Sequence, residues 1–269
     1  MSTIETSVGR IGLTDTGSGP ATSILFLHGV GSDRSVWHPQ HAHFAAERRA
    51  IAIDYPGYGE SEPDAVATRD DFARAALATL DALGIQRAHI CGLSLGGVVA
   101  IAIHALAPDR CASLILADTF AVHPDGPAIH DRSVAASYAM TMSALAEARA
   151  PVLLGAAAGA AIKAEVIATM SAIDPAAFRL GAAAVWLADQ RTRAAAIDVP
   201  TLVLVGEEDG VTPPALSRAL AELVGTAARH RPPVTLDTIA RAGHLANLEQ
   251  PAAFNHAIDR FLRATENAA

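Results

Sequence analysis

The chain has 269 residues, of which 51% are hydrophobic, and a formal net charge of −8 at pH 7. This content is enough for a large buried core and excludes a mainly disordered chain. The acidic balance argues against a nucleic-acid partner or an anionic membrane surface, because neither would meet a basic face on the protein.

The sequence has no segment typical of secretion or membrane insertion. Its first residues form neither a basic nor an apolar region, and the longest apolar stretch, residues 150–162, is too short and too rich in Ala and Gly to span a bilayer. We therefore expect a cytoplasmic protein without a membrane partner. The two cysteines, Cys91 and Cys111, are expected to be small buried hydrophobes rather than a disulfide.

Short apolar runs, bounded by turn residues, predict the strands of a sheet. Because these runs alternate with helical segments, we expect a parallel sheet that binds ligands beyond the carboxyl ends of its strands. Residues 3–14 give a weaker signal for a first strand or hairpin. The expected strands are 23–27, 49–54, 88–91, 112–117, 200–206 and 234–239, and the expected flanking helices are 70–83, 98–106, 214–223 and 251–262.

The loop that follows the strand at 23–27 has the sequence His-Gly-Val-Gly-Ser. Such a loop presents free backbone N–H groups, and the N–H of Val30 could help to hold an oxyanion. A simple turn is the alternative. Just beyond this loop, His38, His41 and His43 have a spacing that invites a metal site, but no further ligands complete one, and we expect no metal.

Residues 88–106 predict a strand, a sharp turn and a helix. Ser94 lies at the tip of the turn, where the backbone is strained, and Gly92 and Gly96 allow the strand and the helix to approach closely. Ser94 is therefore a candidate nucleophile, and the N–H of Leu95 is a second candidate oxyanion donor. An ordinary serine in a glycine-rich loop is the alternative.

The pattern changes between residues 119 and 198, where alanine dominates and no strand is evident. Helices are expected there at 133–148, 161–171 and 175–190. We interpret 119–198 as a helical cap inserted into a core formed by residues 1–118 and 199–269. After the cap, Asp209 follows one predicted strand and His244 follows the last one.

Five short motifs occur in one order along the chain: His-Gly-Val-Gly, Asp-Tyr-Pro-Gly-Tyr-Gly-Glu-Ser, Gly-Leu-Ser-Leu-Gly-Gly, Gly-Glu-Glu-Asp and Gly-His-Leu. In this order and spacing they strongly resemble the α/β-hydrolase family, over residues 20–118 and 199–262. The resemblance implies an α/β-hydrolase fold, in which a mostly parallel central sheet is flanked by helices and carries an inserted helical cap.

The family order of nucleophile, acid and histidine falls on Ser94, Asp209 and His244. The histidine would act as general base towards the serine hydroxyl, and the aspartate would hold the imidazole in its productive tautomer. The rival acids are Asp118, at the end of the strand after the nucleophile, and the neighbouring Glu207 and Glu208. The triad would need no cofactor.

Within the family, the stretches around these motifs look like those of the 3-oxoadipate enol-lactonases. We therefore expect a serine hydrolase of a small carboxylic ester or lactone, with no prediction of oligomeric state. A hydrolase of carbon–carbon bonds and a ligand-binding protein with little turnover are the alternatives. Trp37 and Trp186 are candidate substrate contacts, with core packing as the other interpretation of Trp37. Enol-lactones are anionic, and the arginines available to meet them are Arg132, Arg149, Arg179, Arg191 and Arg193.

Overall fold

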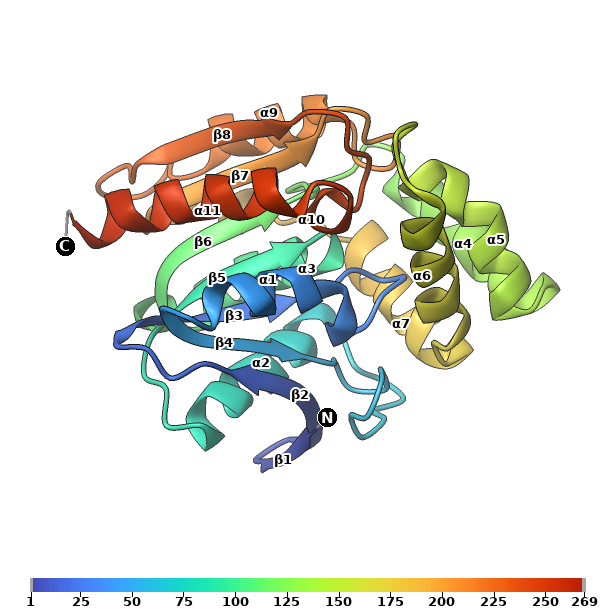
Figure 1. The fold of residues 1–269 in the computed structure, drawn as a ribbon, viewed down its shortest axis with the longest axis horizontal. Coiled ribbons are helices and arrows are strands. Elements are labelled where there is room, and N and C mark those ends of the chain that lie inside the picture. Colours follow the sequence, from blue (N-terminus) through green and yellow to red (C-terminus); the bar gives the residue numbers. More distant parts are fainter. Residues whose placement is uncertain (1, 268–269) are drawn as a thin grey trace.

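An eight-stranded sheet forms the centre of the computed structural model, which describes residues 2–267 (Figure 1). The strands are β1 (Ser2–Thr6), β2 (Gly9–Thr16), β3 (Ala21–Leu27), β4 (Arg48–Ile53), β5 (Ala88–Leu93), β6 (Cys111–Ala117), β7 (Thr201–Gly206) and β8 (Val234–Ile239).

The sheet has the strand order β1-β2-β4-β3-β5-β6-β7-β8. β1 pairs with β2 and β2 with β4 in antiparallel fashion, and every other pairing is parallel. β5 lies near the middle and is buried along its whole length, as an apolar strand covered on both faces must be. The predicted mostly parallel sheet is confirmed, and the weak signal at 3–14 corresponds to the β1–β2 hairpin.

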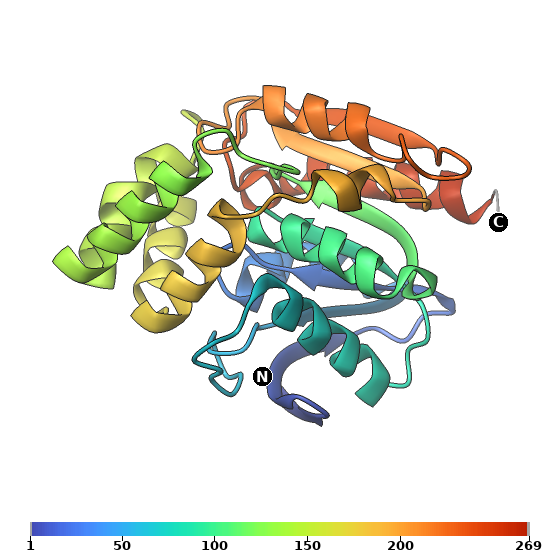
Figure 2. The same ribbon diagram turned by 180° about the vertical axis from the view of Figure 1, so that it is seen from behind.

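Helices cover both faces of this sheet. α1 and α11 lie on one face, and α2, α3 and α9 lie on the other (Figures 1 and 2). Among residues 2–267, no helix combines the length and the apolar character that a membrane span needs. These helices and their short neighbours are α1 (His38–Phe44), α2 (Arg69–Ala82), α3 (Leu95–Leu106), α9 (Pro214–Leu223), α10 (Ala246–Glu249), α11 (Pro251–Glu266) and the 3-10 turns at Arg34–Trp37 and Pro108–Arg110.

The segment between β6 and β7 is helical and lies at one end of the sheet, beyond the carboxyl ends of the strands (Figure 1). We call its first four helices the cap. The predicted boundaries after residues 118 and 198 fall in the loops next to β6 and β7, while the division into two domains stays a prediction. The helices are α4 (Gly126–Ala139), α5 (Met142–Leu153), α6 (Ala160–Ser171), α7 (Pro175–Trp186) and α8 (Arg191–Ala195).

The cap helices differ from the prediction in one place. The single helix expected at 133–148 is wrong, because the chain breaks at Met140 and Thr141 between α4 and α5. Met140 has an extended backbone, and the hydroxyl of Thr141 accepts a hydrogen bond from the N–H of Ala144 as an N-cap. A threonine followed by continuous alanine-rich sequence does not by itself predict such a break. A second difference, after the cap, is α8, which the sequence did not predict.

Candidate active site

Ser94 lies at a strained turn between β5 and α3. Its backbone has φ 56° and ψ −113°, and its N–H donates a hydrogen bond of 2.9 Å to the carbonyl of Ala117. A Cβ added to Gly92 would come within 2.1 Å of the Gly96 carbonyl, and one added to Gly96 within 2.0 Å of the Leu27 carbonyl. Both glycines are therefore required by the close packing of strand and helix, as expected from the sequence.

The loop after β3 lies directly against this turn. A Cβ built on Gly29 would lie 3.4 Å from the Cβ of Ser94. The hydroxyls of Tyr55 and Tyr58 donate hydrogen bonds of 3.3 Å to the carbonyls of His28 and Val30, respectively. These contacts hold the loop through its carbonyl groups.

The N–H groups of Val30 and Leu95 have no hydrogen-bond acceptor within residues 2–267. Leu95 is the first residue of α3, so its N–H cannot be used inside the helix. Val30 lines the same cavity as Ser94, and Leu95 follows Ser94 in the sequence. Two unpaired donors beside a serine hydroxyl are the arrangement that an oxyanion hole requires.

His244 and Asp209 form a buried pair beside this turn. The Nδ1 of His244 lies 2.8 Å from Oδ2 of Asp209. The other oxygen, Oδ1, accepts the N–H groups of Val211 at 2.8 Å and Thr212 at 2.9 Å, and the Thr212 hydroxyl donates to Oδ2 at 2.6 Å. Burial opposes ionisation of Asp209, but His244 and the hydrogen bonds from Thr212 hold its pKa below the ordinary value. Asp209 is thus a fixed carboxylate acceptor for His244.

Asp118, the rival acid, has a different environment. Its Oδ1 accepts the N–H of Gly206 at 2.7 Å, and its Oδ2 is buried without a partner. Desolvation, followed by the charge of Asp209, raises the pKa of Asp118 well above its ordinary value. No hydrogen bond joins Asp118 to His244 in the described chain, and the raised pKa of Asp118 favours its neutral form.

A cavity of about 20 Å³ lies between the turn and the cap. This is roughly the room that one water molecule needs. No aspartate or glutamate of residues 2–267 lines it. The lining comes from both the core and the cap: Gly29, Val30, Gly31, Ser32, Leu93, Ser94, Arg149, Leu153, Trp186, Val211, His244 and Leu245.

The two candidate tryptophans lie in different parts of the protein, and only Trp186 lies at the cavity. Trp186, at the end of α7, lines the cavity. Trp37 is fully buried elsewhere, with its ring centroid 4.8 Å from that of Phe26, so a substrate contact by Trp37 is wrong and core packing is the correct interpretation. No group of three metal-ligating side chains occurs within residues 2–267.

Comparison with known proteins identifies the family of this chain. The model of the alpha/beta hydrolase family matches residues 24–257. The chain belongs to this family. The fold and the family predicted from the five motifs are therefore confirmed, and so is the expectation of an enzyme.

This alpha/beta hydrolase is similar to 3-oxoadipate enol-lactonase 2 of Acinetobacter baylyi, with 29% identity over 92% of the chain and 91% of the relative. The enol-lactonase structure from Burkholderia xenovorans LB400 is 26% identical, covers 97% of this chain and 100% of its own, and has a TM-score of 0.86. A thermophilic esterase from Thermogutta terrifontis, solved with malate bound, is 28% identical over 98% of both chains with a TM-score of 0.88.

A further match is partial. The chain spans 28% of the dihydrolipoyllysine-residue acetyltransferase component of an acetoin cleaving system from Pseudomonas putida, with 42% identity over 38% of its own length.

The hydrolase cap meets the core at several places, the first of which we call the α5 junction. There the N–H of His244 donates to the carbonyl of Leu153 at 2.9 Å. The buried carboxylate of Glu249 accepts the N–H groups of Gly155 at 2.7 Å and Gly243 at 2.9 Å. Glu249 therefore links the end of α5 to the loop that holds the candidate base, and the sequence analysis missed it. Its place five residues after His244 was the available signal.

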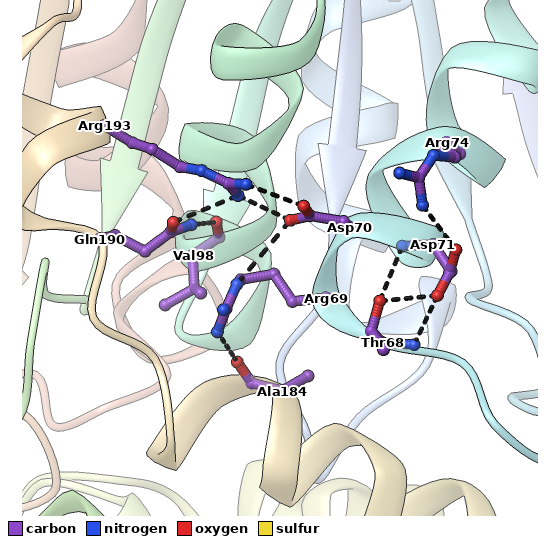
Figure 3. A network of polar contacts seen from close by, with 9 residues as sticks. All are labelled: Thr68, Arg69, Asp70, Asp71, Arg74, Val98, Ala184, Gln190 and Arg193. Atoms are coloured by element: carbon purple, nitrogen blue, oxygen red, sulfur yellow. Dashed lines mark hydrogen bonds and ion pairs between the residues drawn. The ribbon is translucent and has the colours of Figure 1, made fainter.

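The second place, which we call the α7 junction, is drawn in Figure 3. Arg193, in α8, forms two hydrogen bonds of 2.6 and 2.8 Å with Asp70 at the start of α2. Arg69 donates to the carbonyl of Ala184 in α7 at 3.1 Å, and Gln190 donates to the carbonyl of Val98 in α3 at 2.8 Å. These bonds hold α7, the last helix of the cap, and the following α8 on the helices that flank the sheet.

Proposed function

We propose that the protein is a serine hydrolase that cleaves small carboxylic esters or lactones, enol-lactones included, through an acyl-enzyme on Ser94. The observation that carries this proposal is that Ser94, Val30 and His244 line one cavity, while Asp209 pairs with His244 and the unpaired N–H of Leu95 directly follows Ser94. The named esterase and enol-lactonase relatives support the substrate class.

In the first half of the proposed reaction, the hydroxyl of Ser94 attacks the substrate carbonyl carbon. His244 takes the hydroxyl proton and returns it to the leaving alcohol, an effect worth roughly 10² to 10⁴ in rate. Asp209 accepts a hydrogen bond at Nδ1, which leaves Nε2 free to act as the base and stabilises the imidazolium that forms.

The tetrahedral intermediate places a negative charge on the former carbonyl oxygen. The N–H groups of Val30 and Leu95 would donate to it, each contributing about 3 kcal/mol to the barrier reduction. In the second half, His244 activates a water molecule that attacks the acyl-enzyme and releases the carboxylic acid. A lactone gives a single ring-opened product by the same steps.

A fluorophosphonate probe tests the nucleophile. We expect the wild-type protein to be labelled on Ser94, because the probe reacts with an activated serine hydroxyl. Ser94→Ala should abolish labelling and lower ester hydrolysis by about 10³-fold or more, since the remaining groups cannot form an acyl-enzyme. Mass spectrometry of the labelled peptide checks the position, and an unlabelled wild-type protein contradicts the proposal.

The choice of acid is tested by two matched substitutions. Asp209→Asn should lower kcat by about 10² to 10⁴-fold, because an amide no longer fixes the His244 tautomer. Asp118→Asn should change kcat by less than about tenfold, since the amide resembles the neutral acid and can still accept the N–H of Gly206. A larger loss for Asp118→Asn than for Asp209→Asn would show that the acid is assigned to the wrong residue.

A further inference from the structure

Arg149 brings a charge from the cap into the candidate active site. It lies on α5 and lines the cavity together with Ser94 and His244. Leu153, four residues later on the same face of the helix, lines the cavity as well. The guanidinium is thus part of the wall that faces the nucleophile.

This guanidinium has no partner in the protein. Within residues 2–267, Arg149 forms neither a hydrogen bond nor an ion pair, and desolvation alone lowers its pKa, without an acid to oppose it. The other arginines that the sequence offered for an anionic substrate are paired, stacked or exposed: Arg193 on Asp70, Arg191 on Asp189, Arg179 4.4 Å above the ring of Tyr138, and Arg132 in solvent.

A guanidinium has five N–H donors and stays charged at any physiological pH. Arg149 is partly buried, so an anion that pairs with it there is screened less by water than at an exposed site. The cavity lining supplies no carboxylate from the described chain. A carboxylate of the ligand can supply the acceptor that this lining lacks.

The backbone of Arg149 is also held at a set distance from the catalytic base. The carbonyl of Leu153, one helical turn later, accepts the N–H of His244 at 2.9 Å. Glu249 holds the next residues of the same segment through the N–H of Gly155. An anionic group bound by Arg149 would consequently lie in the same cavity as the carbonyl that Ser94 would attack.

We propose that Arg149 binds a carboxylate of the substrate, so that the enzyme prefers esters or lactones that carry a carboxylate near the bond it cleaves. A carboxylate matches the guanidinium fork with two parallel hydrogen bonds, which gives both affinity and orientation. The proposal rests on the hydrolase function at Ser94 and adds the charge of the substrate to it.

Two pairs of esters, each with a charged and a neutral member, test this preference. Mono-p-nitrophenyl adipate and p-nitrophenyl hexanoate differ in the acyl part, and 4-acetoxybenzoate and its methyl ester differ in the alcohol part. Rates are divided by those of hydroxide-catalysed hydrolysis. In at least one pair we expect the wild-type kcat/KM to be about tenfold or more higher for the charged member.

Arg149→Met keeps the length of the side chain and removes its charge. It should lower kcat/KM for the preferred charged ester by about 10- to 100-fold and change that for its neutral partner by less than about threefold. Arg149→Lys should retain part of the preference, because the charge remains without the fork. Arg132→Met, an exposed arginine of the cap, is the control and should leave both rates unchanged.

Thermal unfolding and fluorophosphonate labelling of each variant show whether it is folded with a reactive Ser94. The proposal is overturned if the wild-type enzyme favours neither charged ester, or if Arg149→Met lowers both members of a pair equally. A labelled enzyme with no charge preference refutes only the role of Arg149. An enzyme that is not labelled at Ser94 refutes the hydrolase function itself.

Discussion

The α5 junction and the α7 junction both join the cap to the core by hydrogen bonds, and they differ in burial and in their distance from the chemistry. At the α5 junction, a buried carboxylate and a backbone carbonyl accept N–H groups from the loop of His244 and from the residues after α5. At the α7 junction, the main ion pair is partly exposed, with Arg193 33% and Asp70 26% accessible.

Because of this difference, the two junctions are expected to affect different properties of the protein. The N–H groups at the α5 junction have no water to replace a lost acceptor, so its hydrogen bonds are costly to break. The α5 junction also contains the backbone N–H of His244, the candidate base. The ion pair at the α7 junction is solvated, and water can replace either partner. We therefore expect changes at the α5 junction to alter catalysis and stability together, and changes at the α7 junction to alter stability slightly.

Among variants of the two junctions, the largest effect is expected for Glu249→Ala. It leaves the buried N–H groups of Gly155 and Gly243 without an acceptor, at a cost of about 1–3 kcal/mol in the free energy of unfolding. Because Gly243 precedes His244, a small shift of the base should lower kcat/KM by about 10- to 100-fold. Urea unfolding and ester hydrolysis measure the two effects.

Glu208→Ala is the matched control for that substitution. Glu208 also accepts an N–H from the residues after α5, that of Ala156 at 2.7 Å, but both residues are exposed. Water can take over this bond, so activity should change by less than about threefold. Equal losses for the two alanine variants would contradict the distinction between buried and exposed contacts.

The same difference explains how much of the molecule could be predicted from the sequence. Strands such as β5 and β7 are continuous apolar runs between turn residues, and burial on both faces leaves them no other arrangement. The turn at Ser94 was predictable because Gly92 and Gly96 are required by close packing that the structure shows. Local sequence was sufficient for these elements.

The cap and its junctions were less predictable, because long-range contacts decide them. The break between α4 and α5 has only Thr141 as a local sign. Trp37 and Trp186 are both mostly apolar side chains, and only the tertiary fold places one in the core and the other at the cavity. Arg149 was one of several equal candidates until the structure gave the other arginines their partners or left them exposed.

The smallest effect is expected at the α7 junction, for Asp70→Asn. Arg193 beside Asp70 holds the pKa of this carboxyl below its ordinary value, so the pair stabilises the folded protein above about pH 4 and its contribution is lost as pH falls further. At neutral pH the substitution should cost about 0.5–1 kcal/mol, because the pair is partly exposed. kcat/KM should not change.

The Arg193→Met variant distinguishes the ion pair from the effect of a negative charge at the start of α2, which also stabilises the helix. Arg193→Met should reproduce the loss seen with Asp70→Asn at neutral pH, and for both variants the difference from wild type should shrink as pH falls below about 4, because Asp70 of the wild type becomes protonated. Asp189→Asn is the control, since its pair with Arg191 is exposed and too local in sequence to join cap and core. If Asp70→Asn destabilises the protein and Arg193→Met does not, the helix terminus rather than the junction is responsible. If Asp70→Asn or Arg193→Met lowers kcat/KM, the α7 junction also positions the active site.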